Sequence, residues 1–221
     1  GLELVVDDAV MIPRSPLAEL ICDGFEPWMD PSRIGRALDL CTGSGCLGIA
    51  LAAHLPDVDV DLADVSPAAL RVAARNRALH GLDDRVRIIE SDLFAGIPER
   101  FSAHGLDTAY DVIVSNPPYV GVEEMESLPA EYRHEPRLAL AAGENGLDLV
   151  LRILRDAPDY LADDGILVVE VGNTAEELQH RFRDVPFTWL DFERGGEGVF
   201  LLSREQLVHD HPKFSEAVAD L

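Results

Sequence analysis

Residues 37–48 read Ala-Leu-Asp-Leu-Cys-Thr-Gly-Ser-Gly-Cys-Leu-Gly and join an apolar run to a glycine-rich turn. The run at 37–41 predicts a buried strand, and the pattern at 47–54 predicts a helix. Gly43 and Gly45 let the backbone turn sharply and approach a ligand with no side chain between. This turn equally fits a dinucleotide site or a tight turn without a ligand, so alone it establishes only a strand–turn–helix unit.

The alternation of strand and helix continues along the chain. Further strands are predicted at 58–63, 86–89, 111–114 and 165–169, helices at 66–79 and 147–161, and a closing antiparallel pair at 187–192 and 199–202. Alternating strands and helices are typical of an α/β protein. We therefore expect a doubly wound, seven-stranded, mostly parallel sheet with helices on both faces.

Three domain-level segments are expected. Residues 1–30 predict a short N-terminal β-hairpin, with strands at 2–6 and 9–12, and a linker helix. Residues 31–205 form the expected catalytic domain. Residues 206–221 read as a loosely held C-terminal tail.

The bulk properties limit the classes of partner. The net charge is −23, which disfavours binding to a phosphate backbone and favours a basic protein. Cys22, Cys41 and Cys46 have no metal-site spacing, so no metal is expected. No apolar run has the ~20 residues of a membrane span, and the first residues lack a signal-peptide pattern, so we expect a cytoplasmic protein.

Acidic residues follow two of the predicted strands. Asp64 ends the second strand, where a carboxylate can accept hydrogen bonds from both hydroxyls of a ribose. Asp92 follows the third strand and can accept from an adenine amino group, while Leu93 and Phe94 supply apolar cover for the ring. A helix cap is the alternative role for Asp92.

Asn116-Pro117-Pro118-Tyr119 follows the fourth strand and gives the most specific signal. The two prolines fix an extended backbone without amide donors, so the Asn116 side-chain oxygen and the Pro117 carbonyl face the same space as two acceptors. An amide nitrogen is a poor nucleophile because its lone pair is delocalised. Accepting both of its hydrogens favours the pyramidal nitrogen of the transition state, and Tyr119 can stack on the flat group. The element therefore predicts methylation of a planar amide or amino nitrogen.

Residues 39–48, Asp64, Asp92 and residues 116–119 together resemble the successive motifs of class I S-adenosylmethionine methyltransferases that modify nitrogen. The resemblance implies a Rossmann-like fold, S-adenosyl-L-methionine as cofactor and S-adenosyl-L-homocysteine as product. Protein glutamine methyltransferases and adenine-N6 DNA methyltransferases share the Asn-Pro-Pro-Tyr form, so it does not name the substrate.

The flanking segments narrow the resemblance to the HemK-like protein glutamine methyltransferases, across nearly the whole chain. The segments that carry it are residues 13–21, 131–140, 143–148 and 169–173. The release-factor branch usually reads Pro-Arg-Pro-(Asp/Glu)-Thr-Glu where this chain reads Pro-Arg-Ser-Pro-Leu-Ala-Glu at 13–19. That form and Tyr-Arg-His-Glu-Pro at 132–136 resemble the ribosomal-protein branch, the PrmB type.

The resemblance implies N5-methylation of a glutamine side chain in a basic large-subunit ribosomal protein, the one numbered three. It also implies an N-terminal helical docking domain, and we expect this chain to be the catalytic domain without it. The same reaction on peptide chain release factors is the nearest alternative. Adenine-N6 methylation of nucleic acid, a nicotinamide oxidoreductase and a non-catalytic binding module are more distant ones.

The candidate site residues fall into three groups. The expected catalytic residues are Asn116, Pro117 and Tyr119. The expected cofactor-binding residues are Asp39, Cys41, Thr42, Gly43, Ser44, Gly45, Asp64, Val65, Asp92, Leu93, Phe94 and Asn116. The expected substrate-binding residues are Asn116, Pro117, Pro118, Tyr119, Arg14 and Glu135, where Arg14 and Glu135 either close the mouth of the site or form an ordinary surface ion pair.

Overall fold

The computed structural model describes residues 1–97, 109–119 and 146–221. Its seven strands form one sheet in the order β3-β2-β1-β4-β5-β7-β6. The strands are β1 (Arg36–Leu40), β2 (Asp59–Asp64), β3 (Val86–Glu90), β4 (Tyr110–Ser115), β5 (Leu161–Glu170), β6 (Thr188–Leu190) and β7 (Val199–Ser203). The neighbours from β3 to β5 pair in parallel, and β7 pairs antiparallel with both β5 and β6. The predicted sheet and its closing antiparallel pair are confirmed.

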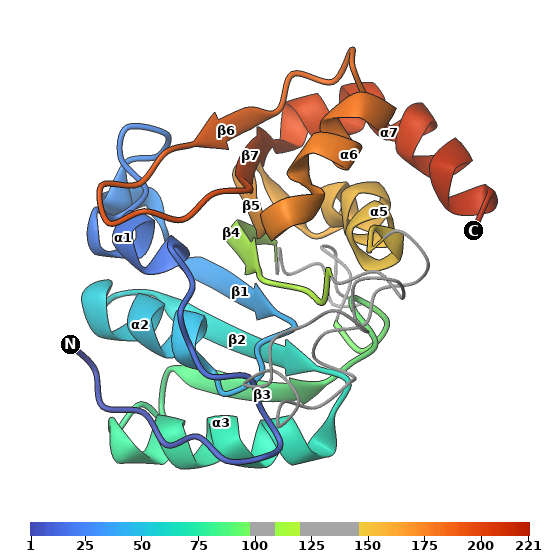
Figure 1. The fold of residues 1–221 in the computed structure, drawn as a ribbon. Helices are drawn as coiled ribbons and strands as arrows, with labels where there is room; N and C mark the ends of the chain where they lie inside the picture. The colour runs from blue at the N-terminus through green and yellow to red at the C-terminus, as the bar shows by residue number, and fades with distance from the viewer. Residues whose placement is uncertain (98–108, 120–145) are drawn as a thin grey trace, which may run out of the picture.

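Helices cover both faces of this sheet (Figure 1). One layer contains α1 (Leu17–Cys22), α2 (Cys46–His54) and α3 (Pro67–Leu79), and the other contains α5 (Asp148–Asp156), α6 (Ala175–Arg181) and α7 (Arg204–Ala219). Short 3-10 turns lie at Pro31–Arg33, Ala157–Asp159 and Gly172–Thr174. The two layers match the expected doubly wound arrangement.

Successive side chains of the central strands enter opposite cores, because side chains alternate across a strand. Leu38 and Leu40 of β1 belong to the core beneath α5 and α7, together with Ile113 of β4. Ala37 of β1 and Val114 of β4 belong to the core beneath α1 and α2. Both faces of the parallel strands are therefore apolar, and the polar site is restricted to the strand ends.

The N-terminal β-hairpin predicted at residues 1–30 is wrong, because residues 1–16 contain no strand. The side chain of Asn76 takes the place of a second strand. Its oxygen accepts from the Val5 amide at 2.7 Å and its nitrogen donates to the Val5 carbonyl at 2.9 Å. An extended segment that satisfies its backbone on a buried amide needs no strand partner.

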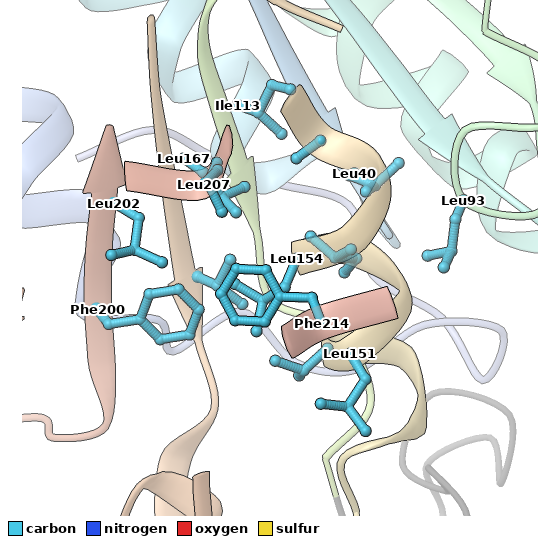
Figure 2. Close-up of a cluster of buried hydrophobic side chains, with 14 of the residues drawn as sticks. Leu40, Leu93, Ile113, Leu151, Leu154, Leu167, Phe200, Leu202, Leu207 and Phe214 are labelled. Carbon is cyan, nitrogen blue, oxygen red and sulfur yellow. The ribbon is translucent and has the colours of Figure 1, made fainter. Parts of the chain in front are cut away.

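The loosely held tail predicted at 206–221 is also wrong. A capping box at Ser203 and Gln206 opens α7. The helix buries Leu207 and Phe214 in the larger core, and Figure 2 shows Phe214 beside Leu154 and Leu151. The C-terminal residues thus complete one layer of the fold.

Phe214→Ala should lower the free energy of unfolding by about 3–5 kcal/mol, the usual cost of truncating a buried phenylalanine. Val208→Ala on the same helix is the matched control, because Val208 is 49% exposed. The control should change stability by less than about 0.5 kcal/mol. Urea denaturation measures both variants, and equal effects would show that α7 does not pack on the core.

Candidate active site

A cavity of about 670 Å³ lies at the carboxyl ends of the parallel strands. Its volume is in the range of small-molecule sites, which lie at this edge in open α/β sheets. The structure brings most predicted site residues to its wall, namely Arg14, Asp39, Cys41, Thr42, Gly43, Ser44, Asp64, Val65, Asp92, Leu93, Asn116 and Pro118.

The glycines of the turn after β1 have different roles. Gly43 has a φ of +55°, and a Cβ there would meet no atom within 4 Å, so its backbone is open to a ligand. A Cβ on Gly45 would instead lie 3.1–3.3 Å from Ile49, Leu62 and Ala73. Gly45 permits close packing of α2, and in the described structure it does not line the cavity.

Asp39 is buried and stabilises this turn from below. Its Oδ2 accepts from Thr42 Oγ1 at 2.5 Å and from the Gly48 amide at 2.8 Å. Burial raises the pKa of its carboxyl to about 7, although both hydrogen bonds act in the opposite direction. A Cβ on Gly48 would lie 3.0 Å from Asp39 Cβ, so the bond depends on glycine at position 48.

Asp64 lies at the end of β2, and each of its carboxylate oxygens accepts a hydrogen bond from one backbone amide. Gly43 donates to Oδ2 at 2.9 Å, and Ser66 donates to Oδ1 at 2.8 Å. Each oxygen keeps a lone pair for a further donor, because an ionised carboxylate has about four acceptor sites. Burial raises the pKa of Asp64. The geometry suits a ligand diol on the cavity side.

Asp92, Leu93 and Phe94, which follow β3, have different surroundings. Asp92 is exposed and pairs with Arg152 of α5 at 3.0 Å. Leu93 lines the cavity, with a φ of +48°. Phe94 stacks on Tyr160 with the ring centroids 4.5 Å apart, inside the core. Of these two apolar residues, Leu93 therefore lines the cavity and Phe94 lies in the core.

The end of β4 positions Asn116. Ser115 Oγ donates to the Leu40 carbonyl at 2.7 Å, which joins this end to β1. The Asn116 side-chain oxygen is buried and has no hydrogen-bond partner within the described structure. Because buried acceptors are nearly always paired, an orphan oxygen at a cavity requires an explanation.

The remaining residues of this element form the surroundings of Asn116. Pro117 is buried and Pro118 lines the cavity. Tyr119 packs on Gly172, where a Cβ would lie 2.7 Å from the tyrosine ring. In the described structure neither Pro117 nor Tyr119 contributes to the cavity wall. Glu135 and its predicted pairing with Arg14 lie outside the described residues.

Several lining residues were not predicted from the sequence. Asp8 to Met11 of the N-terminal segment and Asp148, Leu149 and Arg152 of α5 all face the cavity. The described residues contain no cluster of three or more possible metal ligands, and among them no helix is long and apolar enough to cross a membrane.

The comparison with solved structures defines the fold class. The sheet order, with its reversed β7, is that of the class I methyltransferase fold, as the alignments with solved methyltransferases show. The catalytic domain of human METTL16, solved with MAT2A 3′UTR hairpin 6, aligns with a TM-score of 0.65 and 19% identity over 91% of this chain and 74% of that one. A methyltransferase from Pyrococcus furiosus aligns with a TM-score of 0.60 and 18% identity, over 92% of this chain and 89% of that one. The family model "Methyltransferase small domain" matches residues 26–130.

The chain belongs to the family of ribosomal protein uL3 glutamine methyltransferases. It is 48% identical to that protein of Francisella tularensis over 94% of its own length, and 50% identical to that of Bordetella pertussis over 94%. It spans 64% of the first relative and 67% of the second. The resemblance to the ribosomal-protein branch is thus confirmed.

Asp39→Asn should remove one component of the pH dependence of folding. The folded pKa of Asp39 is raised to about 7, so folded protein holds a proton that unfolded protein releases near pH 4. Wild-type stability should therefore fall relative to the variant as pH rises from 4 to 7, by up to about 1.4 kcal/mol per pH unit. Urea denaturation at several pH values measures this difference, and parallel curves for the two proteins would contradict the raised pKa.

Proposed function

We propose that this protein transfers a methyl group from S-adenosylmethionine to the side-chain nitrogen of a glutamine in ribosomal protein uL3. Family membership supports the reaction class. The observation that carries the proposal is the unpartnered Asn116 oxygen at a cavity of cofactor size. The catalytic domain expected at residues 31–205 extends in this proposal through α7, because Leu207 and Phe214 belong to its core.

The residues of the cavity fit the methyl donor. Gly43 leaves open space for close approach of a ligand, and Asp64 has acceptor capacity for the ribose hydroxyls. Val65 and Leu93 offer apolar surface for the adenine, with Asp92 nearby to accept from its amino group. When bound, the donor supplies a methyl group activated by a sulfonium.

The acceptor amide requires positioning more than it requires a base. We assign the Asn116 oxygen, which lies at the cavity, to one hydrogen of the glutamine amide. We assign the Pro117 carbonyl to the other hydrogen and Tyr119 to the flat face, although neither residue lines the cavity of the described structure. Bonds that strengthen as the nitrogen becomes pyramidal stabilise the transition state over the bound amide. The proton leaves after transfer, so the site needs no metal and no strong base.

The choice of uL3 is supported by the names of the relatives and by the net charge of the chain. A net charge of −23 favours a basic ribosomal protein and opposes nucleic acid as substrate. Release factors remain the nearest alternative substrate for the same chemistry.

Incubation of the protein with S-adenosylmethionine and uL3 should add one methyl group to a glutamine side chain of uL3. Replacing a hydrogen by a methyl group raises the mass by about 14 Da, which tandem mass spectrometry detects. A release factor in a parallel reaction should stay unmodified. Methylation of the release factor alone would reject uL3 as the substrate, and no modified glutamine in either would reject the proposed reaction.

Asn116→Ala should lower kcat by at least about 100-fold, since it removes an acceptor aimed at the transition state. Binding of S-adenosylhomocysteine, measured by calorimetry, should change by less than about threefold, because Asp64 and Gly43 are untouched. Asn116→Asp keeps an oxygen of the same reach and should retain more activity than the alanine variant. Wild-type turnover in Asn116→Ala would contradict this role.

A further inference from the structure

The N-terminal strap, residues 5–15, crosses the carboxyl edge of the sheet. In Figure 1 the blue chain runs beside α3 and then passes the strand ends to reach α1. Val10 and Met11 in its middle, and Arg14 and Ser15 at its end, line the cavity. The strap is thus a wall of the proposed active site, contributed by a segment without regular secondary structure.

Asn76 holds the first end of the strap. This buried side chain binds both the amide and the carbonyl of Val5, and its nitrogen also donates to the Ser44 carbonyl at 2.9 Å. Ala9 and Val10 pack near α3 beyond this point. The first end is therefore tied to the glycine turn that we assign to the methyl donor.

Ser15 holds the second end through a bond that spans 155 positions of sequence. Its Oγ donates to Glu170 Oε2 at 2.5 Å and accepts from the Leu17 amide at 3.2 Å. Glu170 is the last residue of β5 and is 8% exposed. Burial raises the pKa of Glu170, and the Ser15 hydrogen bond acts against that shift. A charge-assisted bond of this kind is stronger than a neutral one.

This second end lies next to the residues that we assign to the amide. Val169 pairs with Ser115 across β5 and β4, so Glu170 and Asn116 each follow one member of the same pair. Pro16 packs on Gly196, where a Cβ would lie 2.5 Å away. The Ser15–Glu170 bond and the contact of Pro16 with Gly196 therefore both hold this end of the strap over the cavity.

We infer that Ser15 and Glu170 are positioning residues: their hydrogen bond holds the Arg14 end of the strap beside Asn116 and so determines affinity for the amide substrate. Binding of the methyl donor depends mainly on the other end, at Asn76. The inference rests on the proposed function, because it names which half of that site the strap completes.

Limited trypsin digestion tests the Ser15–Glu170 hydrogen bond without measuring methyl transfer. Cleavage after Arg14 needs local release of the strap, so the peptide Gly1–Arg14 should appear about tenfold faster in Ser15→Ala and in Glu170→Ala than in wild type, as expected for loss of one charge-assisted bond. Ser15→Thr keeps the hydroxyl and should stay near wild type, and Glu170→Gln keeps an acceptor without the charge and should lie between wild type and Glu170→Ala. Equal release from all variants would overturn the inference.

Kinetics with uL3 then separate positioning from general structure. Ser15→Ala and Glu170→Ala should raise KM for uL3 about tenfold, with kcat and the Kd for S-adenosylhomocysteine within about twofold. Ser203→Ala is the matched control, because it also removes a serine that accepts a helix amide, at the start of α7. It should lower the melting temperature and leave KM unchanged. An equal rise in KM for Ser203→Ala, or no rise for Ser15→Ala, would refute the positioning role.

The two proposals fail separately. If wild-type protein methylates no glutamine, the proposed function is wrong, while trypsin cleavage still reports whether the Ser15–Glu170 bond holds the strap. If wild type is active and Ser15→Ala matches it in both assays, only the positioning role is rejected.

Discussion

The hydrogen bonds of the buried Asp39 carboxylate constrain the rest of the site, because they connect strand, turn and helix at a single oxygen. Thr42 and Gly48 both donate to this oxygen, so the turn between them can take few other shapes. The short distance from Asp39 to α2 also requires glycine at position 48. Gly43 is left facing open space, and its amide is held by Asp64. The two hydrogen bonds offset part of the free-energy cost of burying the Asp39 carboxylate, and they keep the turn ordered without a ligand.

A second constraint comes from the order of the strands. β1 lies between β2 and β4, so the chain leaves the sheet centre in opposite directions and opens a crevice at the strand ends. Asp64 lies on one side of β1 and Asn116 on the other, with Ser115 bonded to the Leu40 carbonyl between them. The topology thus brings Asp64, which we assign to the cofactor, and Asn116, which we assign to the substrate, to the wall of one cavity.

Sequence reasoning succeeded where the signal was local. The strand pattern and the turn at 39–48 predicted the sheet and the edge at which the cavity lies, because periodicity of two and glycine-rich turns depend on near neighbours. The prediction of a hairpin in the strap was wrong, because the apolar residues of the strap alternate as in a strand. The side chain that binds Val5 belongs to Asn76, 71 positions away. Choosing Leu93 over Phe94 as the cavity residue needs the backbone, because both are apolar and adjacent. The α7 helix was missed although Ser203 and Gln206 carry a local capping signal.

Two of the three non-glycine residues with a positive φ in the described structure line the cavity, and the third, Phe25, lies in the core. Cys41 and Leu93 have φ values of +61° and +48°, and both line the cavity directly after or near a strand end. Such values are unfavourable for residues with a Cβ, and they persist only where surrounding contacts determine them. Cys41 is held between the paired end of β1 and the Asp39-bonded turn, and Leu93 accepts from Ser91 Oγ on its carbonyl. Both residues therefore contribute to the same cavity, while β1 and β2 behind them keep their regular parallel pairing.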